Sequence, residues 1–69
     1  MKYLAVVYGG WGKHDDKEKA MKIAMKEAGL SKLPKQRLLY VVADDAYVDL
    51  YGYINHKEGE EPKLIEEHK

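Results

Sequence analysis

The sequence predicts a small two-layer α+β domain in which one helix packs on a three-stranded sheet. Three observations favour this fold class: a short apolar run near the start, an amphipathic segment after it, and an alternating segment near residue 50. They give the order β-α-β-β over a single domain, residues 1–55. We expect residues 56–69 to form a charged C-terminal tail, either frayed or with a short helical turn starting at Pro62.

The first strand is predicted over residues 2–8, which are mostly apolar and partly β-branched. Gly9 and Gly10 end it, because glycine breaks regular structure. We expect the segment Gly9-Gly-Trp-Gly-Lys13 to be a flexible connection to the helix.

The helix is predicted from about residue 16 to residue 28. Asp15 is a suitable N-cap, and Glu18 three residues later completes a capping box. Gly29 suits the position after the last turn. The apolar face that would lie on the sheet contains Ala20, Met21, Ala24, Met25 and Ala28.

Residues 37–54 dominate the prediction, because they are the most strand-like part of the sequence. They predict two strands, 37–43 and 46–54, joined by a tight turn at Asp44-Asp45. In the second strand Val48, Leu50 and Ile54 fall on one face and the tyrosines on the other.

The face of this hairpin away from the helix is the predicted partner-binding surface, because exposed apolar patches mark interaction sites and tyrosine suits them. Aspartates at the turn and beside the tyrosines would complement a basic or mixed partner surface. Trp11 either caps the core or anchors a partner. The candidate site residues are Trp11, Tyr40, Asp44, Asp45, Tyr47, Asp49, Tyr51 and Tyr53.

Composition narrows the function classes. Twelve basic and twelve acidic side chains cancel, whereas nucleic-acid modules are usually basic. There is no cysteine to staple a core this small, so a homodimer is the expected source of extra stability. Without an 18-residue apolar run or a signal peptide, we expect a cytoplasmic protein that does not insert into a membrane.

Motifs for catalysis, metals or phosphate are lacking. The spacing from Gly9 to Lys13 is too short for a phosphate loop, and His14 follows where Ser or Thr is required. The histidines show no metal-ligand spacing, and no nucleophile has a base beside it. We therefore predict a protein without enzymatic activity, metal or cofactor.

The sequence resembles two kinds of known protein. The β-α-β-β order, the length and a tryptophan near the helix start resemble the dodecin flavin-storage family, which implies a ligand-binding homo-oligomer. The small size and the richness in Lys and Glu resemble virus-encoded inhibitors of host machinery, anti-CRISPR proteins among them, which implies inhibition by occluding a site.

The leading hypothesis is a small protein-binding module, self-associating as a homodimer, that uses the tyrosine face and the acidic turn, as a viral inhibitor would. The alternative is a small-ligand-binding homo-oligomer with Trp11 and the glycine segment at a subunit junction. The least favoured alternative is a nucleic-acid-binding domain, because the aspartates beside the tyrosines would repel phosphates and Arg37 is the only basic residue of the hairpin.

Overall fold

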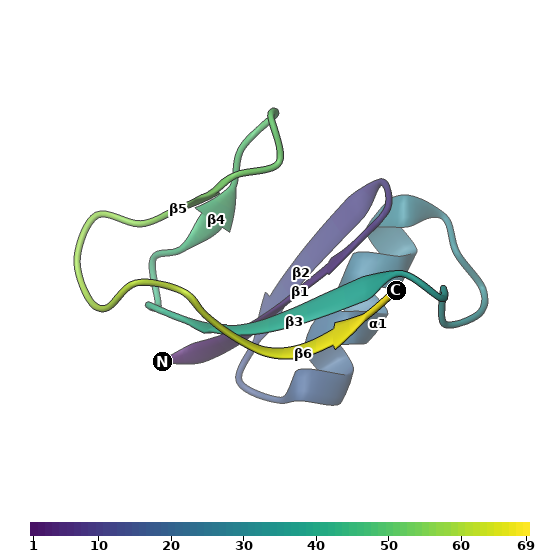
Figure 1. Ribbon diagram of the computed structural model, residues 1–69, viewed down its shortest axis with the longest axis horizontal. Helices are drawn as coiled ribbons and strands as arrows, with labels where there is room; N and C mark the ends of the chain where they lie inside the picture. The colour runs from purple at the N-terminus through teal and green to yellow at the C-terminus, as the bar shows by residue number, and fades with distance from the viewer.

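A four-stranded antiparallel sheet with the strand order β2-β1-β3-β6 forms the centre of the molecule (Figure 1). The computed structural model describes residues 1–69. The strands of this sheet are β1 (Lys2–Val7), β2 (Gly10–His14), β3 (Arg37–Val42) and β6 (Lys63–His68). The α+β class with one helix packed on a sheet is confirmed, and the sheet is antiparallel with four strands instead of the expected three.

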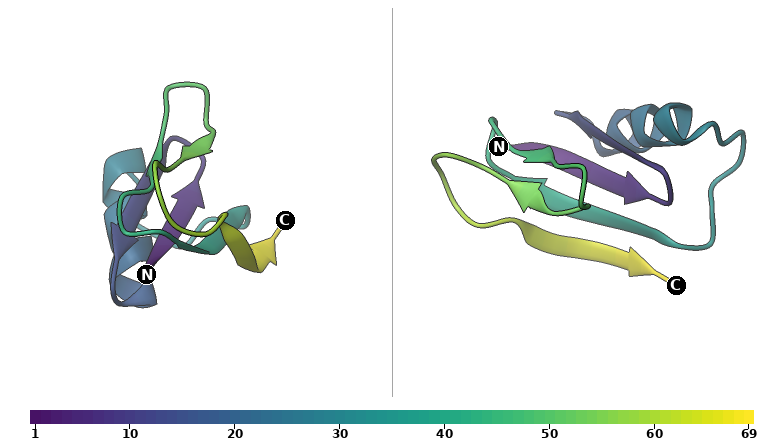
Figure 2. Two further views of the ribbon diagram at one scale, coloured as in Figure 1. Left: turned by 90° about the vertical axis from the view of Figure 1, so that its left-hand side faces the viewer. Right: turned by 90° about the horizontal axis from the view of Figure 1, so that it is seen from above.

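The single helix, α1 (Lys17–Ala28), lies on one side of this sheet, and a two-stranded ribbon rises from the other side (Figure 2). The ribbon consists of β4 (Tyr47–Val48) and β5 (Ile54–Asn55). We call residues 47–55 the arm and residues 49–53 its tip. At twelve residues, with charges on its surface, α1 falls short of the length and apolarity needed to cross a membrane.

The helix boundaries agree with the prediction, but its cap is one residue later. The Asp16 carboxylate, and not that of Asp15, accepts hydrogen bonds from the amides of Glu18 and Lys19 at 2.8 and 3.4 Å. Asp15 instead pairs with Lys2 at 2.8 Å, which lowers the pKa of Asp15 below its ordinary value. Gly29 ends the helix in the left-handed conformation, as expected.

The glycine segment is a strand and not a flexible connection. Gly10 and Gly12 face the helix, so the backbone of α1 lies directly on the backbone of β2. A β carbon at Gly12 would lie 2.4 Å from the Ala20 carbonyl oxygen and 2.6 Å from the Ala24 amide nitrogen. Only glycine fits this contact, because real β carbons do not approach backbone atoms so closely.

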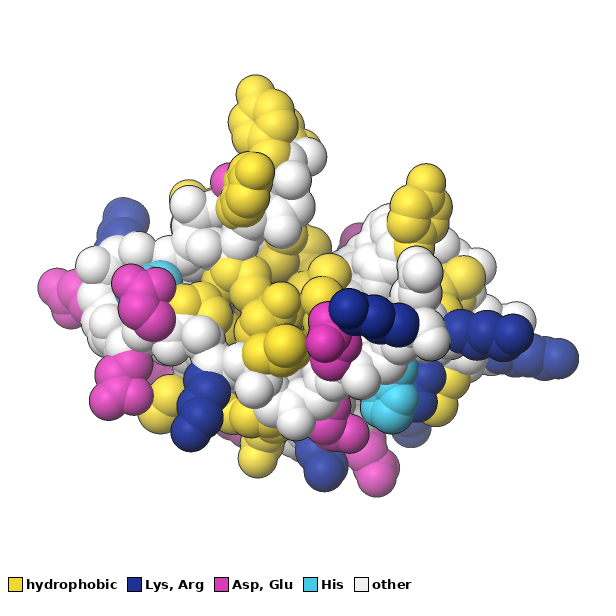
Figure 3. All heavy atoms as spheres, viewed as in Figure 1, with side chains coloured by type: hydrophobic (Ala, Val, Ile, Leu, Met, Phe, Trp, Pro, Cys, Tyr) yellow, Lys and Arg dark blue, Asp and Glu magenta, His cyan; other side chains and the backbone are white.

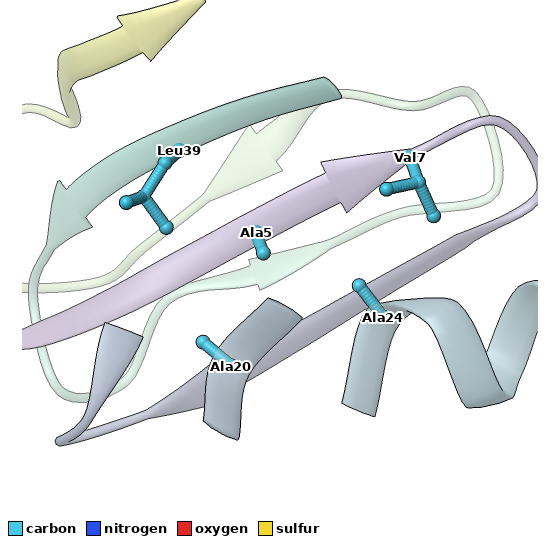
Figure 4. Close-up of a cluster of buried hydrophobic side chains, with 5 residues drawn as sticks. All are labelled: Ala5, Val7, Ala20, Ala24 and Leu39. Atoms are coloured by element: carbon cyan, nitrogen blue, oxygen red, sulfur yellow. The ribbon is translucent and has the colours of Figure 1, made fainter. Parts of the chain in front are cut away.

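Small side chains fill the layer between helix and sheet. Ala20 and Ala24 of α1 meet Ala5, Val7 and Leu39 from β1 and β3, as Figure 4 shows. A second cluster lies on the other side of the sheet, where Leu4, Val42 and Ala46 are buried. Leu4 and Val42 are the largest side chains that are fully buried, so the core contains little apolar volume.

The predicted hairpin over residues 37–54 is wrong. β3 pairs with β1 and β6, whereas β4 pairs with β5. A turn closed by the Ala46 amide and the Ala43 carbonyl, 3.0 Å apart, directs the chain away from the sheet. Lys13 of β2 holds this turn, because its Nζ donates to the carbonyls of Asp44 and Ala46 at 2.7 Å each.

The C-terminal segment is also a strand and not a helical turn. β6 pairs with β3 across a bulge between Leu39 and Tyr40, at which Ile65 is the extra residue. All six residues of β6 are exposed. Lys63, Glu66 and Glu67 lie along this outer edge, and charged edges with bulges discourage pairing with other strands.

Substituting Gly12 with Ala tests the close contact between α1 and β2. The added β carbon meets backbone atoms, so the helix must move, and we expect the free energy of unfolding to fall by about 3 kcal/mol. Urea denaturation followed by circular dichroism measures this loss.

Gly29→Ala is the matched control. Its left-handed backbone has φ 71° and nothing lies within 4 Å of the added carbon, so only the conformational cost of about 1 kcal/mol is expected. Equal losses in the two variants would contradict the role given to Gly12.

Candidate interaction surface

The base of the arm is anchored on the open side of the sheet. Val48 and Ile54 pack against the cluster of Leu4, Val42 and Ala46. Trp11 of β2 and Tyr40 of β3 are half-buried against the same cluster. The arm is therefore fixed at its base by apolar contacts with β1, β2 and β3, although its two strands are only two residues long.

The Asp49 carboxylate organises the tip of the arm. Its Oδ1 accepts hydrogen bonds from the amides of Tyr51 and Tyr53 at 2.9 and 3.0 Å. Its Oδ2 accepts one from the Asn55 side-chain amide at 2.8 Å. The Gly52 amide donates to the Asp49 carbonyl at 3.0 Å, and Gly52 has φ 85°. The tip thus has a defined backbone and not that of a loose loop.

The side chains of this ordered tip point into solvent. Leu50 is fully exposed, and Tyr51 and Tyr53 are 86% and 71% exposed. In Figure 3 hydrophobic side chains cover the projecting arm and the part of the sheet below it. A leucine and two tyrosines exposed together on a defined loop form an apolar patch of the kind that marks interaction sites.

A cleft of about 500 Å³ lies between the arm and the turn that joins β1 to β2. Val6 and Trp11 line it from the sheet, and Val48, Leu50 and Tyr51 line it from the arm. Asp49 is the only charged residue among its lining residues, and its carboxylate faces hydrogen-bond donors of its own loop. The cleft is therefore apolar and has no free charge.

The structure separates the tyrosines that the sequence placed on one sheet face. Tyr40 lies in the sheet and is half-buried, and Tyr47 lies in the arm and is about half exposed. Tyr51 and Tyr53 lie at the tip, beyond any strand. Trp11 both packs on the core and lines the cleft. The tyrosine sheet face as such is not formed.

Leu50 and Tyr8 are exposed hydrophobic residues near the cleft that the predicted site did not include. Leu50 was expected to face the helix, but the segment Asp49-Leu-Tyr-Gly52 forms a turn and not a strand. Asp at the first position and Gly at the fourth are the signature of a type I turn, so this signal was available. Tyr8 is exposed in the turn after β1, where the sequence was read as strand.

The three aspartates of the predicted site are engaged within the chain. The N-terminal ammonium group lies 2.9 Å from Asp44 and lowers the pKa of its carboxyl. Asp45 accepts hydrogen bonds from the amides of Lys57 and Glu58, and the first of these contributes most to its lowered pKa. Asp45 and Asp49 thus hold loops together, whereas Asp44 pairs with the chain's N-terminus.

The remaining polar groups do not converge on a catalytic or metal site. No group of three His, Cys, Asp or Glu side chains is placed to hold a metal ion. His14 accepts a hydrogen bond from the Asp16 amide through Nδ1 at 3.0 Å. Lys13, the lysine that a phosphate loop would use, is held by two carbonyl groups.

A comparison with protein-family models, curated proteins and solved structures finds no match to this chain.

The order of the arm tip is expected to depend on pH through Asp49. The Asn55 side-chain amide, followed by the Tyr53 and Tyr51 amides, holds the pKa of Asp49 below its ordinary value. A carboxyl with a lowered pKa stabilises the folded state above its ordinary pKa, and this contribution is lost as the pH falls through the lowered pKa. Amide hydrogen exchange at Tyr51 and Tyr53 should therefore accelerate, relative to the intrinsic rates, in that acidic window.

The Asp49→Asn variant is the control, because it has no charge to lose at this position. Its tip should be less ordered at neutral pH and should show no further opening of the tip on acidification. Tip protection in wild type that does not change through the acidic window would contradict the role of Asp49.

Proposed function

We propose that this chain is a small non-enzymatic protein-binding module that uses the tip of the arm and the adjacent cleft. The observation that carries the proposal is the exposure of Leu50, Tyr51 and Tyr53 on a loop whose backbone is fixed by Asp49. This surface replaces the tyrosine sheet face expected from the sequence.

A fixed tip favours binding because less entropy is lost when a partner immobilises it. Ordering a flexible segment costs binding free energy, and a preorganised one avoids much of that cost. Tyrosines add large contact areas with few rotatable bonds, together with a hydroxyl that can hydrogen-bond at the rim. Leu50, Tyr51 and Tyr53 have the properties of anchor residues at protein interfaces.

The chemistry of the surroundings favours a partner with an apolar pocket and a basic or mixed border. The tip itself has no free charge. We call residues 56–62, between β5 and β6, the return segment. Acidic groups from this segment and from the turn before β4 gather at the far end of the sheet, where Asp44, Asp45, Glu58 and Glu60 line one shallow depression. Asp44 and Asp45 are engaged within the chain, so Glu58 and Glu60 are the carboxylates there that would attract lysines and arginines of a partner that extends beyond the tip.

The ligand-binding and nucleic-acid alternatives receive less support. The β-α-β-β order behind the dodecin resemblance is replaced by an order with additional strands, and Gly10 and Gly12 contact α1 instead of a ligand. No lysine or arginine lines the cleft, although backbone contacts to nucleic acid require them. The apolar, uncharged tip suits a protein surface better.

Affinity capture with variant baits tests this proposal. Wild type, Leu50→Ser, Tyr51→Ala and Tyr53→Ala are immobilised and exposed to extract of the source organism, and the retained proteins are quantified by mass spectrometry. Anchor residues carry most of the binding free energy, so each arm variant should retain a true partner about tenfold less well or worse.

Leu33→Ser is the matched control, because Leu33 is an exposed leucine of the connector before β3, beside Met21 on the helix side. Leu33→Ser should retain the partner as wild type does. Isothermal titration with the purified partner should rank the affinities of wild type and the variants in the same order as the capture experiment. Retention that is equal for all baits would refute the proposal.

A further inference from the structure

The arm tip projects directly beside a cleft, and both are apolar. Leu50 and Tyr51 border the cleft from one side, and the turn between β1 and β2 borders it from the other. We infer that the cleft receives the arm tip of a second copy of this chain, in a reciprocal dimer. The inference rests on the proposed function, because it names the partner of the same surface.

A projection beside a hollow is complementary to itself under a two-fold rotation. In such an isologous contact the tip of each copy enters the cleft of the other, so every favourable contact occurs twice. Leu50 and Tyr51 of one copy would meet Val6 and Trp11 of the other. The geometry needs no rearrangement of the tip, whose backbone Asp49 already holds.

Charge does not oppose this contact between identical surfaces. Two copies of a charged patch would repel each other, but the cleft and the tip carry no charge apart from the Asp49 carboxylate, which is hydrogen-bonded. The whole chain has twelve basic and twelve acidic side chains, so two copies also lack net repulsion at a distance.

The area available is that of a weak dimer. Tyr51 and Tyr53 together offer roughly 300 Å². Leu50 adds to this, and the reciprocal arrangement covers the cleft of each copy as well as its tip. Tip and cleft together stay below the roughly 800 Å² per partner of stable interfaces, in the range of weak ones that bury less than about 1,200 Å² in total. Covering them would also add apolar burial to a core with few large side chains.

The open sheet edge at β6 is less suited to pairing two copies of the chain. β6 is an open edge, but its bulge at Ile65 and its charged residues oppose an extended ladder. The arm and the cleft carry neither obstacle, so we assign the contact to them.

Sedimentation equilibrium over a range from micromolar to millimolar protein tests the dimer, with the emission of Trp11 as a second readout. Trp11 is the only tryptophan and lines the cleft, so its emission should shift to shorter wavelength as the dimer forms. Leu50→Ser should weaken each of the two contacts about tenfold, and the dimer about a hundredfold. Leu33→Ser should leave both readouts as in wild type.

Crosslinking tests the reciprocal geometry. The sequence contains no cysteine, so Leu50→Cys provides one thiol for a photoactivatable crosslinker. The labelled variant is mixed with unlabelled chain grown on nitrogen-15. We expect crosslinked peptides that join the arm to residues 6–11 of the nitrogen-15 copy.

Three results would overturn the inference, and they separate it from the proposed function. A dimer that crosslinks elsewhere, at β6 for instance, would assign self-association to another surface. A monomer at every concentration whose arm variants still lose a captured partner would leave the proposed function standing with a different protein in the cleft. If the chain is a monomer and its arm variants capture the same proteins as wild type, both the dimer and the proposed function are refuted.

Discussion

The backbone contact between α1 and β2 determines where everything else in this molecule can lie. Because Gly10 and Gly12 present no side chains, the helix settles over the β2 edge of the sheet and not over its middle. Its small residues Ala20 and Ala24 then suffice to fill the layer beneath. The cost of this arrangement is a core of small side chains, which contributes little hydrophobic stabilisation. The helix does not shield the apolar residues on the opposite side of the sheet, so another segment must shield them from water.

The arm supplies that second cover in part. Val48 and Ile54 shield Leu4 and Val42, while Trp11 fills the space beside them. The same segment that completes the core also carries the exposed tip, so stability and recognition are joined in one short stretch. Lys13 of β2 holds the turn that precedes the arm. Asp45 of that turn accepts a hydrogen bond from the Lys57 amide, which follows the arm, so the two ends of the arm are held together. The Asp45 carboxylate, which the sequence pattern places on a partner-binding surface, thereby shapes the chain instead.

The sequence revealed those elements whose signals are local. The helix was found because Gly29 and the spacing of small apolar residues mark it, and β1 and β3 were found because their apolar runs are continuous. β2 was missed because glycine is normally read as a breaker, although Gly10 and Gly12 alternate with Trp11 and Lys13. Alternation of glycine with large residues marks a strand that meets another backbone closely.

The candidate site was predicted by residue type but not by arrangement. Tyr51 and Tyr53 are exposed as the alternating pattern predicted, yet β4 pairs with the nearby β5 and not with β3, so both tyrosines lie on a turn and not on a sheet face. Strand pairing depends on which segments meet in space, and an alternating pattern cannot reveal it. β6 lacked even that pattern, since an exposed edge strand needs no apolar face.

The position of β6 at the edge of the sheet determines where the molecule begins to unfold. It is held by β3 alone and has no buried side chain, so it belongs to the least stable part of the fold and should detach first in local unfolding. Its departure would leave the segment Leu38–Val42 as an open edge, which is apolar, rich in β-forming residues and free of charge. Segments of that kind assemble into intermolecular sheets when they are exposed. The pairing of β6 with β3 therefore covers a segment that is prone to form intermolecular sheets, and chains in which β6 opens more often should aggregate more readily.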